Sequence, residues 1–473
     1  MELIESFNNI LWNGILIYLL LGVGIYFTLG TRLIQFRHFG HTFTILKNSN
    51  KSDSSGISSF QALCTSLAAR VGTGNLTGVA IALTAGGPGS IFWMWLVALV
   101  GMATSFAEST LAQLYKIKDN KDNYRGGPAY YMENGLKMRW MGVLFSIFLI
   151  ITFGLVFNSV QANSIAQATS VAFGFNQFHV GIILAIICGI IIFGELRLIS
   201  QVAKLVVPIM AIAYLMLTFF VMINNIERLP DVFLLIIKHA FGLQEVISGA
   251  FGYSTSQAIT QGIQRGLFSN EAGMGSAPNV AAAASPYPPH PVSQGYMQML
   301  GVFIDTLVIC SATAIIIISS GALDNSDSII SGIELTQKAF SLAVGDWSEI
   351  FIAIAIFFFS FTSIIANYSY AESNIVFLKK NIYLELYILK FATLGMIIFG
   401  SIAEMPLVWK LADISMGLMT LINLISILML SGIVFKLNKD YNQQRNVGKL
   451  PTFDINAYPY IKKNVKDDNI WKK

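Results

Sequence analysis

Residues 58–89, SSFQALCTSLAARVGTGNLTGVAIALTAGGPG, are mostly apolar, but glycine alternates with polar residues between Gly72 and Gly78. In residues 246–284, VISGAFGYSTSQAITQGIQRGLFSNEAGMGSAPNVAAAA, Gly262, Gly266, Gly273 and Gly275 lie among polar and charged side chains. Each glycine inside a helix costs about 1 kcal/mol relative to alanine, and polar groups in hydrocarbon need partners. Both stretches therefore predict helices that are interrupted within a membrane and open toward a cavity lined by protein.

The composition of the whole chain supports a membrane protein. Of its 473 residues, 54% are hydrophobic and 12% are charged, whereas about 25% are charged in an average globular protein. The net charge of +4 is too small to indicate nucleic-acid binding. Three cysteines that lie far apart, with no CxxC pair, exclude a disulfide framework and a thiolate metal site. The sequence predicts an all-α protein that crosses the membrane many times.

Eleven apolar segments are candidates for membrane-crossing helices, which need about 20 residues each. If the N-terminus lies outside, the cytoplasmic loops and tail receive 23 Lys and Arg residues and the outer loops receive three. This asymmetry predicts that the N-terminus is outside and the C-terminus is cytoplasmic. The segments are 8–30, 58–85, 90–115, 141–171, 179–194, 203–224, 245–284, 294–320, 346–371, 382–403 and 407–435.

The two interrupted segments are the second and the seventh, so each opens a block of five. Interrupted helices at matching positions of two halves are typical of transporters with inverted repeats, and an odd number of helices per repeat forces the halves into opposite orientations. We expect residues 58–224 and 245–435 to form the two repeats, after an extra helix and loop in 1–57 and before a basic cytoplasmic tail in 436–473. The alternative is that the glycines only allow helices to pack closely.

A broken helix can hold charged groups without a full countercharge. The N-terminus of a half-helix presents free N–H groups that suit a carboxylate, and unwound carbonyl groups suit a cation. An amino acid carried together with Na⁺ fits both. The sequence contains no GxxxxGK[ST] or HExxH motif, and nothing in it indicates an enzyme. An ion channel is a further alternative, because channel filters also interrupt helices.

Six stretches carry a more specific signal: RVGTGNLTGVA (70–80), GGPGSIFWMWLVALVGMATSFAE (86–108), GGPAYYM (126–132), QANSIA (161–166), RGLFSNEAGMGSAPNVAAAA (265–284) and DTLVIC (305–310). They resemble the alanine/glycine:cation symporter family, the sodium:alanine symporters, over nearly the whole chain. The resemblance implies a leucine-transporter-type fold of ten core helices behind one added helix, in a bacterial or archaeal plasma membrane. It also implies a monomer that imports a small neutral amino acid such as alanine or glycine, with Na⁺, or sometimes H⁺, as coupling ion and no other cofactor.

The resemblance also implies a Na⁺ site. In the wider fold, two carbonyl groups before the first break and a Thr-Ser pair on the eighth core helix surround the ion. In this chain those groups are the carbonyls of Ala68 and Val71 and the hydroxyls of Thr362 and Ser363. Neutral oxygen ligands suit a hard cation. The alternative is that the hydroxyls bond to carbonyl groups of their own helix.

The substrate is expected to lie beside this ion, with its carboxylate on amide groups of the first break. Asn158 and Gln161, three residues apart, share a helix face and either touch the substrate or pin helices together. The full set of candidates is the N–H groups of Thr73, Gly74 and Asn75, the second-break residues Gln261, Gly262 and Gly266, and the side chains of Asn158, Gln161 and Asn367.

Asn367 departs from the pattern that we expect of the alanine carriers, which have a bulky aromatic residue at this position. If Asn367 borders the pocket for the substrate side chain, its amide enlarges that pocket and adds hydrogen-bonding capacity. Glutamine is then a candidate substrate beside alanine and glycine.

Ionisable residues within apolar segments are functional candidates by default. Asp305 could complete a second cation site, carry a proton, or be the structural partner of Arg70 or Arg265. His290, in the Pro-rich stretch after the seventh segment, is expected to be a solvated loop residue. Glu108 and Glu271 are expected to form ion pairs near the cytoplasmic side, with Arg70, Arg265 or Arg125 as partners.

Overall fold

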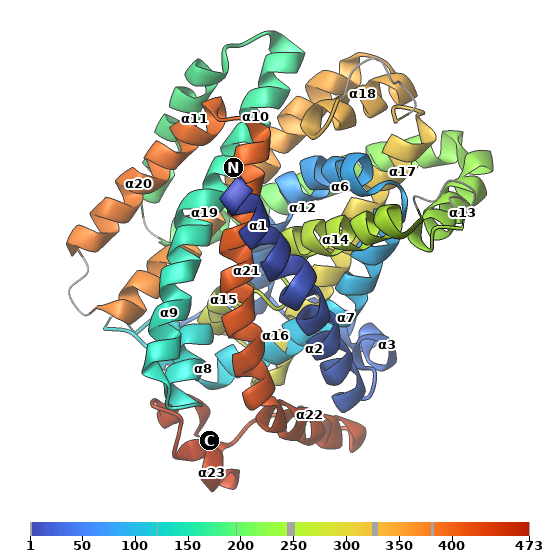
Figure 1. Ribbon diagram of the computed structural model, residues 1–473. Helices are drawn as coiled ribbons and strands as arrows, with labels where there is room; N and C mark the ends of the chain where they lie inside the picture. Colours follow the sequence, from blue (N-terminus) through green and yellow to red (C-terminus); the bar gives the residue numbers. More distant parts are fainter. Residues whose placement is uncertain are drawn as a thin grey trace.

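The computed structural model describes residues 2–120, 122–194, 196–243, 251–323, 330–379 and 383–472. These residues are mainly helical (Figure 1). Seven of the described helices are long and apolar enough to cross a membrane, or up to eight if one bent pair counts as a single span. The prediction of an all-α, multi-pass membrane protein is confirmed, and the count of eleven spans stays a prediction.

The described elements follow one another along the chain in four groups. The first contains α1 (Glu2–Leu11), η1 (Trp12–Leu16), α2 (Ile17–Gly30), α3 (Ile34–Arg37) and α4 (Phe39–Lys47). The second contains β1 (Ile57–Ser58), α5 (Ser59–Arg70), η2 (Gly74–Gly78), α6 (Val79–Gly86), α7 (Gly89–Leu114), β2 (Ile117–Lys118), β3 (Tyr124–Arg125), α8 (Pro128–Asn134), α9 (Arg139–Leu149), η3 (Ile150–Val156), α10 (Phe157–Phe173), α11 (Gln177–Ile192), α12 (Leu196–Asn224), η4 (Ile226–Arg228) and α13 (Leu229–Ala240).

The third group contains α14 (Phe251–Asn270), α15 (Ala277–Ala283), β4 (Ala284–Ser285), α16 (Val292–Val302), η5 (Phe303–Cys310), α17 (Ser311–Ser319), α18 (Ile333–Val344), α19 (Trp347–Leu378), α20 (Tyr383–Ile402) and α21 (Met405–Met429). The C-terminal group contains α22 (Ser431–Asn446), η6 (Ile455–Ala457), α23 (Pro459–Lys462) and η7 (Asp468–Trp471). Strand β1 pairs in parallel with β4, and β2 pairs antiparallel with β3.

The first interrupted stretch forms a broken helix, as predicted. Helix α5 begins at a capping box, in which the Ser58 hydroxyl accepts from the Gln61 N–H and the Gln61 side chain accepts from the Ser58 N–H. The helix ends at Arg70, and Val71 takes an extended conformation. The chain then resumes as the π-helical turn η2, which continues into α6.

The second interrupted stretch breaks at a different place from the one predicted. Gln261, Gly262 and Gly266 lie inside the continuous helix α14. The break follows at residues 271–276, where Glu271 and two glycines take positive φ values. The prediction that the three residues stand at the break is therefore wrong.

Close helix packing explains the two glycines of α14. A Cβ atom at Gly262 would lie 2.3 Å from the Ser90 carbonyl oxygen, and one at Gly266 would lie 2.6 Å from Val97 Cγ1. Both neighbours belong to α7. At these positions the close-packing alternative is correct: the glycines let α14 lie directly against α7.

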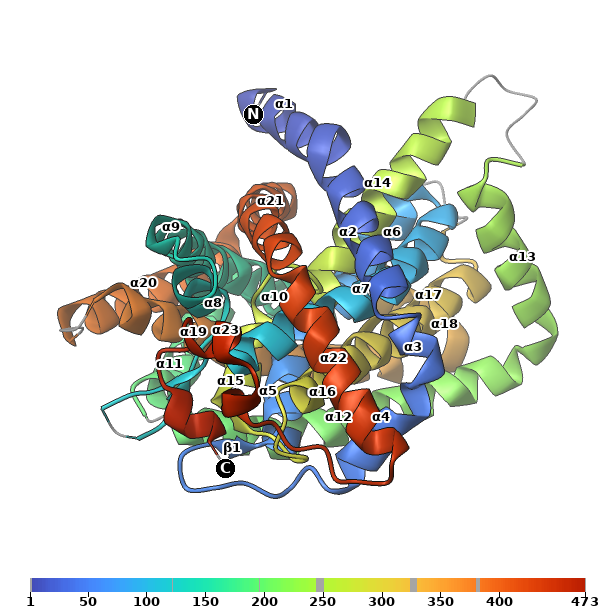
Figure 2. The ribbon, with the colours of Figure 1, turned by 90° about the horizontal axis from the view of Figure 1, so that it is seen from below.

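The halves of the two broken segments pair crosswise. Half-helix α5 packs against α15, and α6 packs against α14. The labels α6 and α14 lie together in both views (Figures 1 and 2). Helices α10 and α19 pack against each other, and α19 also contacts α5. The backbone breaks are therefore enclosed by protein, which is the condition for interrupted helices in a membrane.

The C-terminal segment is folded onto one end of the helix bundle (Figures 1 and 2). The buried indole of Trp471 donates from Nε1 to the Leu114 carbonyl oxygen (3.2 Å). Lys116 Nζ donates to the Ala284 carbonyl oxygen (2.9 Å) and lies 3.8 Å from the centroid of the Tyr124 ring and 5.1 Å from that of Trp471. These contacts join the C-terminal segment to the end of α7 and to β4, which directly follows the second broken segment.

The prediction that His290 is solvated is wrong. Its side chain is fully buried, and its Nε2 lies 3.1 Å from Asp440 Oδ2. Its ring also packs edge-on against Tyr441 and Phe453. Burial lowers the pKa of His290, and Asp440 opposes this shift. Residues of the C-terminal segment, about 150 positions away, cover this loop, and such long-range packing has no signal in the local sequence.

We expect the stability of the protein relative to its Lys116→Met variant to rise with pH. Burial lowers the pKa of Lys116 from 10.5 to about 7, although Asp53 opposes the shift. Between these values the unfolded chain binds a proton that the folded chain does not, so the difference in unfolding free energy changes by up to about 1.4 kcal/mol per pH unit. Thermal unfolding of the wild type and of Lys116→Met between about pH 7 and pH 9.5 measures this difference in stability. A difference that stays constant over this range contradicts the prediction.

Candidate functional site

The amide groups of the first break already face oxygen acceptors. The Gly72 N–H donates to Asn75 Oδ1 (3.0 Å), and the Thr73 N–H donates to Gln161 Oε1 (3.1 Å). Thr73 is the N-cap of η2, so Thr73, Gly74 and Asn75 form the N-terminal end of the second half-helix. Such an end carries free N–H groups and a positive dipole. The structure thus brings Gln161 of α10 to the predicted carboxylate position.

Three of the four predicted Na⁺ ligands meet at the first break. The Ser363 hydroxyl donates to the Ala68 carbonyl oxygen (2.7 Å) and lies 3.5 Å from that of Val71. It also lies 2.9 Å from the Phe359 carbonyl oxygen of its own helix. The Thr362 hydroxyl instead donates to the same Phe359 carbonyl (2.9 Å). For Thr362, the alternative that the hydroxyl bonds to its own helix is therefore the one that the structure shows. The oxygens of Ala68, Val71 and Ser363 form a cluster of neutral oxygen atoms, which are ligands of the kind that a hard cation such as Na⁺ prefers.

Asn367 and Asn158 contact each other directly. Asn367 Nδ2 donates to Asn158 Oδ1 (3.1 Å), and Asn158 Nδ2 donates to the carbonyls of Phe153 and Gly154 in the π-helical segment η3. Asn158 is therefore fully engaged within the protein. The Asn367 Oδ1 atom is buried and has no hydrogen-bond partner in the part of the chain that the structure describes. An acceptor of this kind is costly unless a ligand or water satisfies it.

An aromatic wall, which we define as Phe157, Phe268 and Trp409, lies beside the two breaks. The Phe268 ring centroid is 4.5 Å from that of Phe157 and 4.5 Å from that of Trp409. Next to Phe268, Ser269 comes close to the first break, since a Cβ atom at Gly74 would lie 2.9 Å from Ser269 Cα. The end of α14 therefore supplies Phe268 and Ser269 to this region, in place of the predicted Gln261, Gly262 and Gly266.

Asp305 lies where elements of both broken segments meet. Its Oδ1 accepts from Asn75 Nδ2 (2.7 Å), and its Oδ2 accepts from the hydroxyls of Ser269 (2.7 Å) and Thr306 (2.8 Å). Cys310 Sγ lies 3.3 Å from Asn75 Nδ2 and 3.2 Å from Ser269 Oγ. Within the described residues Asp305 forms no ion pair with an arginine, so the structural-partner alternative does not hold at contact distance.

The predicted ion pairs of Glu108 and Glu271 are absent among the described residues. Glu108 instead accepts from the Gly273 N–H (3.3 Å) and from Asn423 Nδ2 (2.9 Å), and Glu271 accepts from the Ser276 hydroxyl (2.5 Å). All of these partners are neutral groups at or near the second break. The Gly273 N–H, which the interrupted helix leaves free, and the side chains of Asn423 and Ser276 take the place of the expected arginines.

Arg265 has a different partner from those predicted. Its Nη2 donates to Asp413 Oδ2 of α21, and both side chains are buried. The guanidinium also lies 4.6 Å from the centroid of the Trp409 ring. This contact ties α14 to α21 next to the aromatic wall.

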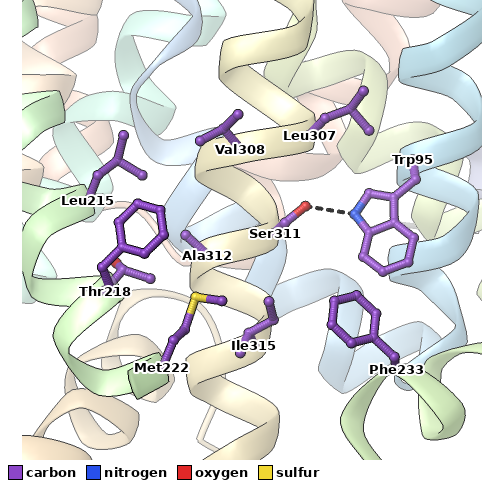
Figure 3. A pocket seen from close by; sticks show the side chains of 11 residues that line it. Trp95, Leu215, Thr218, Met222, Phe233, Leu307, Val308, Ser311, Ala312 and Ile315 are labelled. Carbon is purple, nitrogen blue, oxygen red and sulfur yellow. Dashed lines mark hydrogen bonds between the residues drawn. The ribbon is translucent and has the colours of Figure 1, made fainter. Parts of the chain in front are cut away.

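An apolar groove lies apart from the two breaks, between α12, α13 and the segment η5–α17 (Figure 3). Its polar residues in the figure are Thr218 and the pair in which Trp95 Nε1 donates to Ser311 Oγ (2.7 Å). Phe219 and Phe233, which line it, are 57% and 41% exposed on the protein surface. A lining that is mostly apolar suits hydrocarbon better than a zwitterion.

Comparison with known proteins shows which family this chain belongs to. The sequence profile of the sodium:alanine symporter family matches residues 1–455. The chain belongs to this family. It is 49% identical to the probable sodium/glutamine symporter GlnT of Bacillus subtilis (strain 168), with 98% of this chain and 94% of the relative covered. It is 47% identical to the amino-acid carrier protein AlsT of the same organism (98% and 96% covered). It is 35% identical to the sodium/alanine symporter AgcS of Methanococcus maripaludis (94% and 98% covered).

Membership in the sodium:alanine symporter family makes the protein a multi-pass membrane transporter and not an enzyme. The family and its named relatives are sodium or amino-acid symporters and carriers. The resemblance identified from the six sequence stretches is confirmed.

The sequence reasoning missed several residues that the fold of this family member brings to the breaks. They are Phe268, Ser269, Cys310, Trp409 and Asp413. The aromatic residues and Cys310 give no signal, since such residues are common in apolar segments. Asp413 could have been found by the rule that singled out Asp305, because it is also an ionisable residue inside an apolar segment.

Proposed function

We propose that this protein is a Na⁺-coupled symporter that imports a neutral amino acid, namely alanine, glycine or glutamine, by alternating access. The observation that carries the proposal is the contact of Ser363 Oγ with the carbonyls of Ala68 and Val71. This contact puts a neutral oxygen cluster directly beside the N-terminal end of the second half-helix, where the Thr73 N–H donates to Gln161. A cation and a carboxylate could therefore lie side by side, each on its own type of ligand.

In this proposal Na⁺ binds to the Ala68 and Val71 carbonyls and to the Ser363 hydroxyl, which turns its lone pairs toward the ion. Thr362 joins as a further ligand if its hydroxyl leaves the Phe359 carbonyl. Because two of the ligands are backbone groups of the break, the ion stabilises the broken conformation. It thereby holds the neighbouring amide groups in position for the substrate.

The substrate carboxylate would bind to the N–H groups of Thr73, Gly74 and Asn75. Gln161 Oε1 now accepts from Thr73 and would give up this place or share it. The aromatic wall bounds the substrate on the side of α14. Binding of both solutes would then let the paired half-helices α5–α15 and α6–α14 rearrange between outward-open and inward-open forms.

The proposal includes the arrangement of the chain in the membrane. Residues 58–224 and 245–435 would form a 5+5 inverted repeat of the leucine-transporter type, supported by the crosswise packing of the broken segments. The N-terminus would lie outside and the tail in the cytoplasm of a bacterium or archaeon, and the protein would act as a monomer. The count of basic residues in the loops supports this orientation.

The unpartnered Asn367 Oδ1 supports glutamine as a substrate. It could accept a hydrogen bond from the side-chain amide of glutamine, and alanine and glycine have no such group. The relative GlnT is a probable sodium/glutamine symporter. We expect Asn367→Phe to reduce glutamine uptake by about tenfold relative to alanine uptake, because one buried hydrogen bond and the space for the longer side chain are lost.

Uptake of labelled alanine, glycine and glutamine into proteoliposomes tests the proposal. Wild-type protein, Asn367→Phe and the control Ser369→Ala are compared with an inward Na⁺ gradient, with a proton gradient and with neither. Ser369 bonds to a carbonyl of its own helix, so its variant should behave like the wild type. Accumulation driven by protons alone favours H⁺ coupling. Ion conduction that needs no amino acid favours a channel, and no uptake of any of the three amino acids refutes the proposal.

A further inference from the structure

Helices α3, α4 and α22 lie where two candidate membrane spans end. The span that contains α2 ends at Gly30, and the span formed by α21 ends at Met429. Helices α3 and α4 follow the first of these spans, and α22 follows the second. The two regions meet, since the Tyr441 hydroxyl of α22 lies 2.9 Å from His41 Nε2 of α4 (Figure 2). They therefore lie at the level where lipid headgroups contact the protein.

Helices α3 and α4 turn one face toward the protein and one face outward. Ile34 and Gln35 are buried, and Gln35 Nε2 donates to the Thr28 hydroxyl (2.9 Å). The neighbouring Phe36 and the later Phe43 are instead 60% and 50% exposed. Exposed apolar side chains of this kind, next to the end of a span, are typical of a segment that lies in the membrane interface.

The charges of this region are almost all positive. Residues 31–52 contain four Lys and Arg residues, two His and no Asp or Glu. Helix α22 adds Arg445, and its one acidic residue, Asp440, is already paired with His290. Among the described residues, no ion pair includes Arg37 or Arg445. The region thus carries an excess of positive charge that side chains do not compensate at contact distance.

The guanidinium group of Arg445 is only partly paired. Its Nη2 donates to His38 Nδ1 (2.8 Å), so the proton of this imidazole lies on Nε2. Its Nη1 is buried and has no hydrogen-bond partner in the part of the chain that the structure describes. A buried donor on a charged group is costly when it is left unpaired. An anion from outside the chain would supply the missing acceptor.

Positive charges also act on the two imidazoles beside Arg445. Burial lowers the pKa of His38 and of His41 to about 4, and Arg445 adds to both shifts. Arg37 adds further to the shift of His38. The same positive charges favour an anion at this place. A phosphate group suits it best, because it carries negative charge and several oxygens that accept hydrogen bonds from guanidinium groups.

We propose that Arg445, His38 and Arg37 bind the phosphate group of an anionic phospholipid, from the leaflet that surrounds this end of the helix bundle. In the orientation proposed above, this is the cytoplasmic leaflet. Arg445 Nη1 and the Nε2–H of His38 donate to the phosphate oxygens, and the exposed Arg37 contributes its charge. The acyl chains enter the bilayer beside Phe36. The inference goes beyond the proposed function, because it does not depend on which solutes are carried.

The bound lipid would join two regions that are distant in the sequence. His38 and Arg445 are 407 positions apart, and a phosphate between them would hold α22 against α3 and α4. Since α22 begins the C-terminal segment, the lipid would also help to keep that segment folded onto the end of the bundle. The site is therefore expected to affect stability as well as lipid binding.

Native mass spectrometry of the full-length protein in detergent is the direct test. The wild type is titrated with phosphatidylglycerol and with phosphatidylcholine of the same acyl chains. We expect phosphatidylglycerol to bind at least about tenfold more tightly, and Arg445→Gln to lower its affinity by about tenfold, as for the loss of one hydrogen bond to a charged group. Equal affinity for the two lipids, or an unchanged affinity in folded Arg445→Gln, overturns the proposal.

A milder variant keeps the test informative if Arg445→Gln does not fold. Arg37→Gln leaves the contact between Arg445 and His38 in place, and we expect it to weaken phosphatidylglycerol binding by about fivefold. The matched control is Lys466→Gln, which removes the same charge from an exposed position of the C-terminal segment and should change nothing. If the two variants weaken binding equally, lipid binding follows net charge alone and the proposed site is wrong.

Thermal unfolding distinguishes a lipid from free phosphate. The melting temperature of the detergent-solubilised wild type should rise with phosphatidylglycerol and stay unchanged with inorganic phosphate at the same concentration. The rise should be smaller in Arg37→Gln and equal to that of the wild type in Lys466→Gln. If inorganic phosphate alone produces the full rise and phosphatidylglycerol adds nothing, the site holds a soluble anion and the assignment to a lipid is wrong.

Discussion

Ser363→Ala is expected to raise the Na⁺ concentration for half-maximal uptake by about ten- to a hundredfold. The hydroxyl of Ser363 is the side-chain oxygen that meets both carbonyls of the first break. A hydrogen-bonding contact to a charged group contributes about 1.5–3 kcal/mol, which corresponds to that range of affinity. The maximal uptake rate at saturating Na⁺ should fall less than the apparent affinity, because the backbone ligands remain.

Thr362, the neighbour of Ser363, allows a sharper test of the Na⁺ site. Thr362 bonds to its own helix, so Thr362→Ala alone should have a smaller effect than Ser363→Ala. The double variant should be more severe than either single variant if Thr362 turns toward the ion during transport. Initial uptake rates over a range of Na⁺ concentrations in proteoliposomes measure all three, with Ser369→Ala as the matched control. An unchanged Na⁺ requirement in the double variant means that the ion binds elsewhere.

Asp413→Asn is expected to destabilise the protein by about 3–5 kcal/mol, the usual cost of removing one partner from a buried ion pair. Arg265 and Asp413 are 3% and 6% exposed, so neither charge can be rescued by water. The variant leaves the guanidinium of Arg265 buried against Trp409 without its carboxylate. Less folded protein and a lower apparent melting temperature should result, and both are measured on detergent-solubilised protein before any transport assay.

A double variant distinguishes lost charge pairing from lost packing. Arg265→Met together with Asp413→Leu removes both charges and fills similar space, so it should recover most of the stability lost in Asp413→Asn. Melting temperatures should then rank the wild type and the double variant above the single variant. A double variant as unstable as Asp413→Asn would show that the packing of these side chains, and not their charge, holds α14 to α21.

Local signals in the sequence were sufficient to predict the class of protein and the position of one of the two helix breaks. Glycine and polar residues at 72–78 predict an interruption, and α5 ends at Arg70 just before them. The second break was misplaced because glycines inside α14 give the same local signal as glycines that end a helix. Gly262 and Gly266 serve close packing on α7, whereas Gly273 and Gly275 take positive φ.

Hydropathy, loop charges and motifs can be recognised within short stretches of sequence. They were enough to predict a multi-pass transporter with interrupted helices. Only the tertiary structure decided that Asp305 meets Asn75 and Ser269 and that Arg265 meets Asp413. The physical reason is that each buried polar group must find a partner, and helix packing supplies that partner from 36 to 230 residues away along the chain in these pairs.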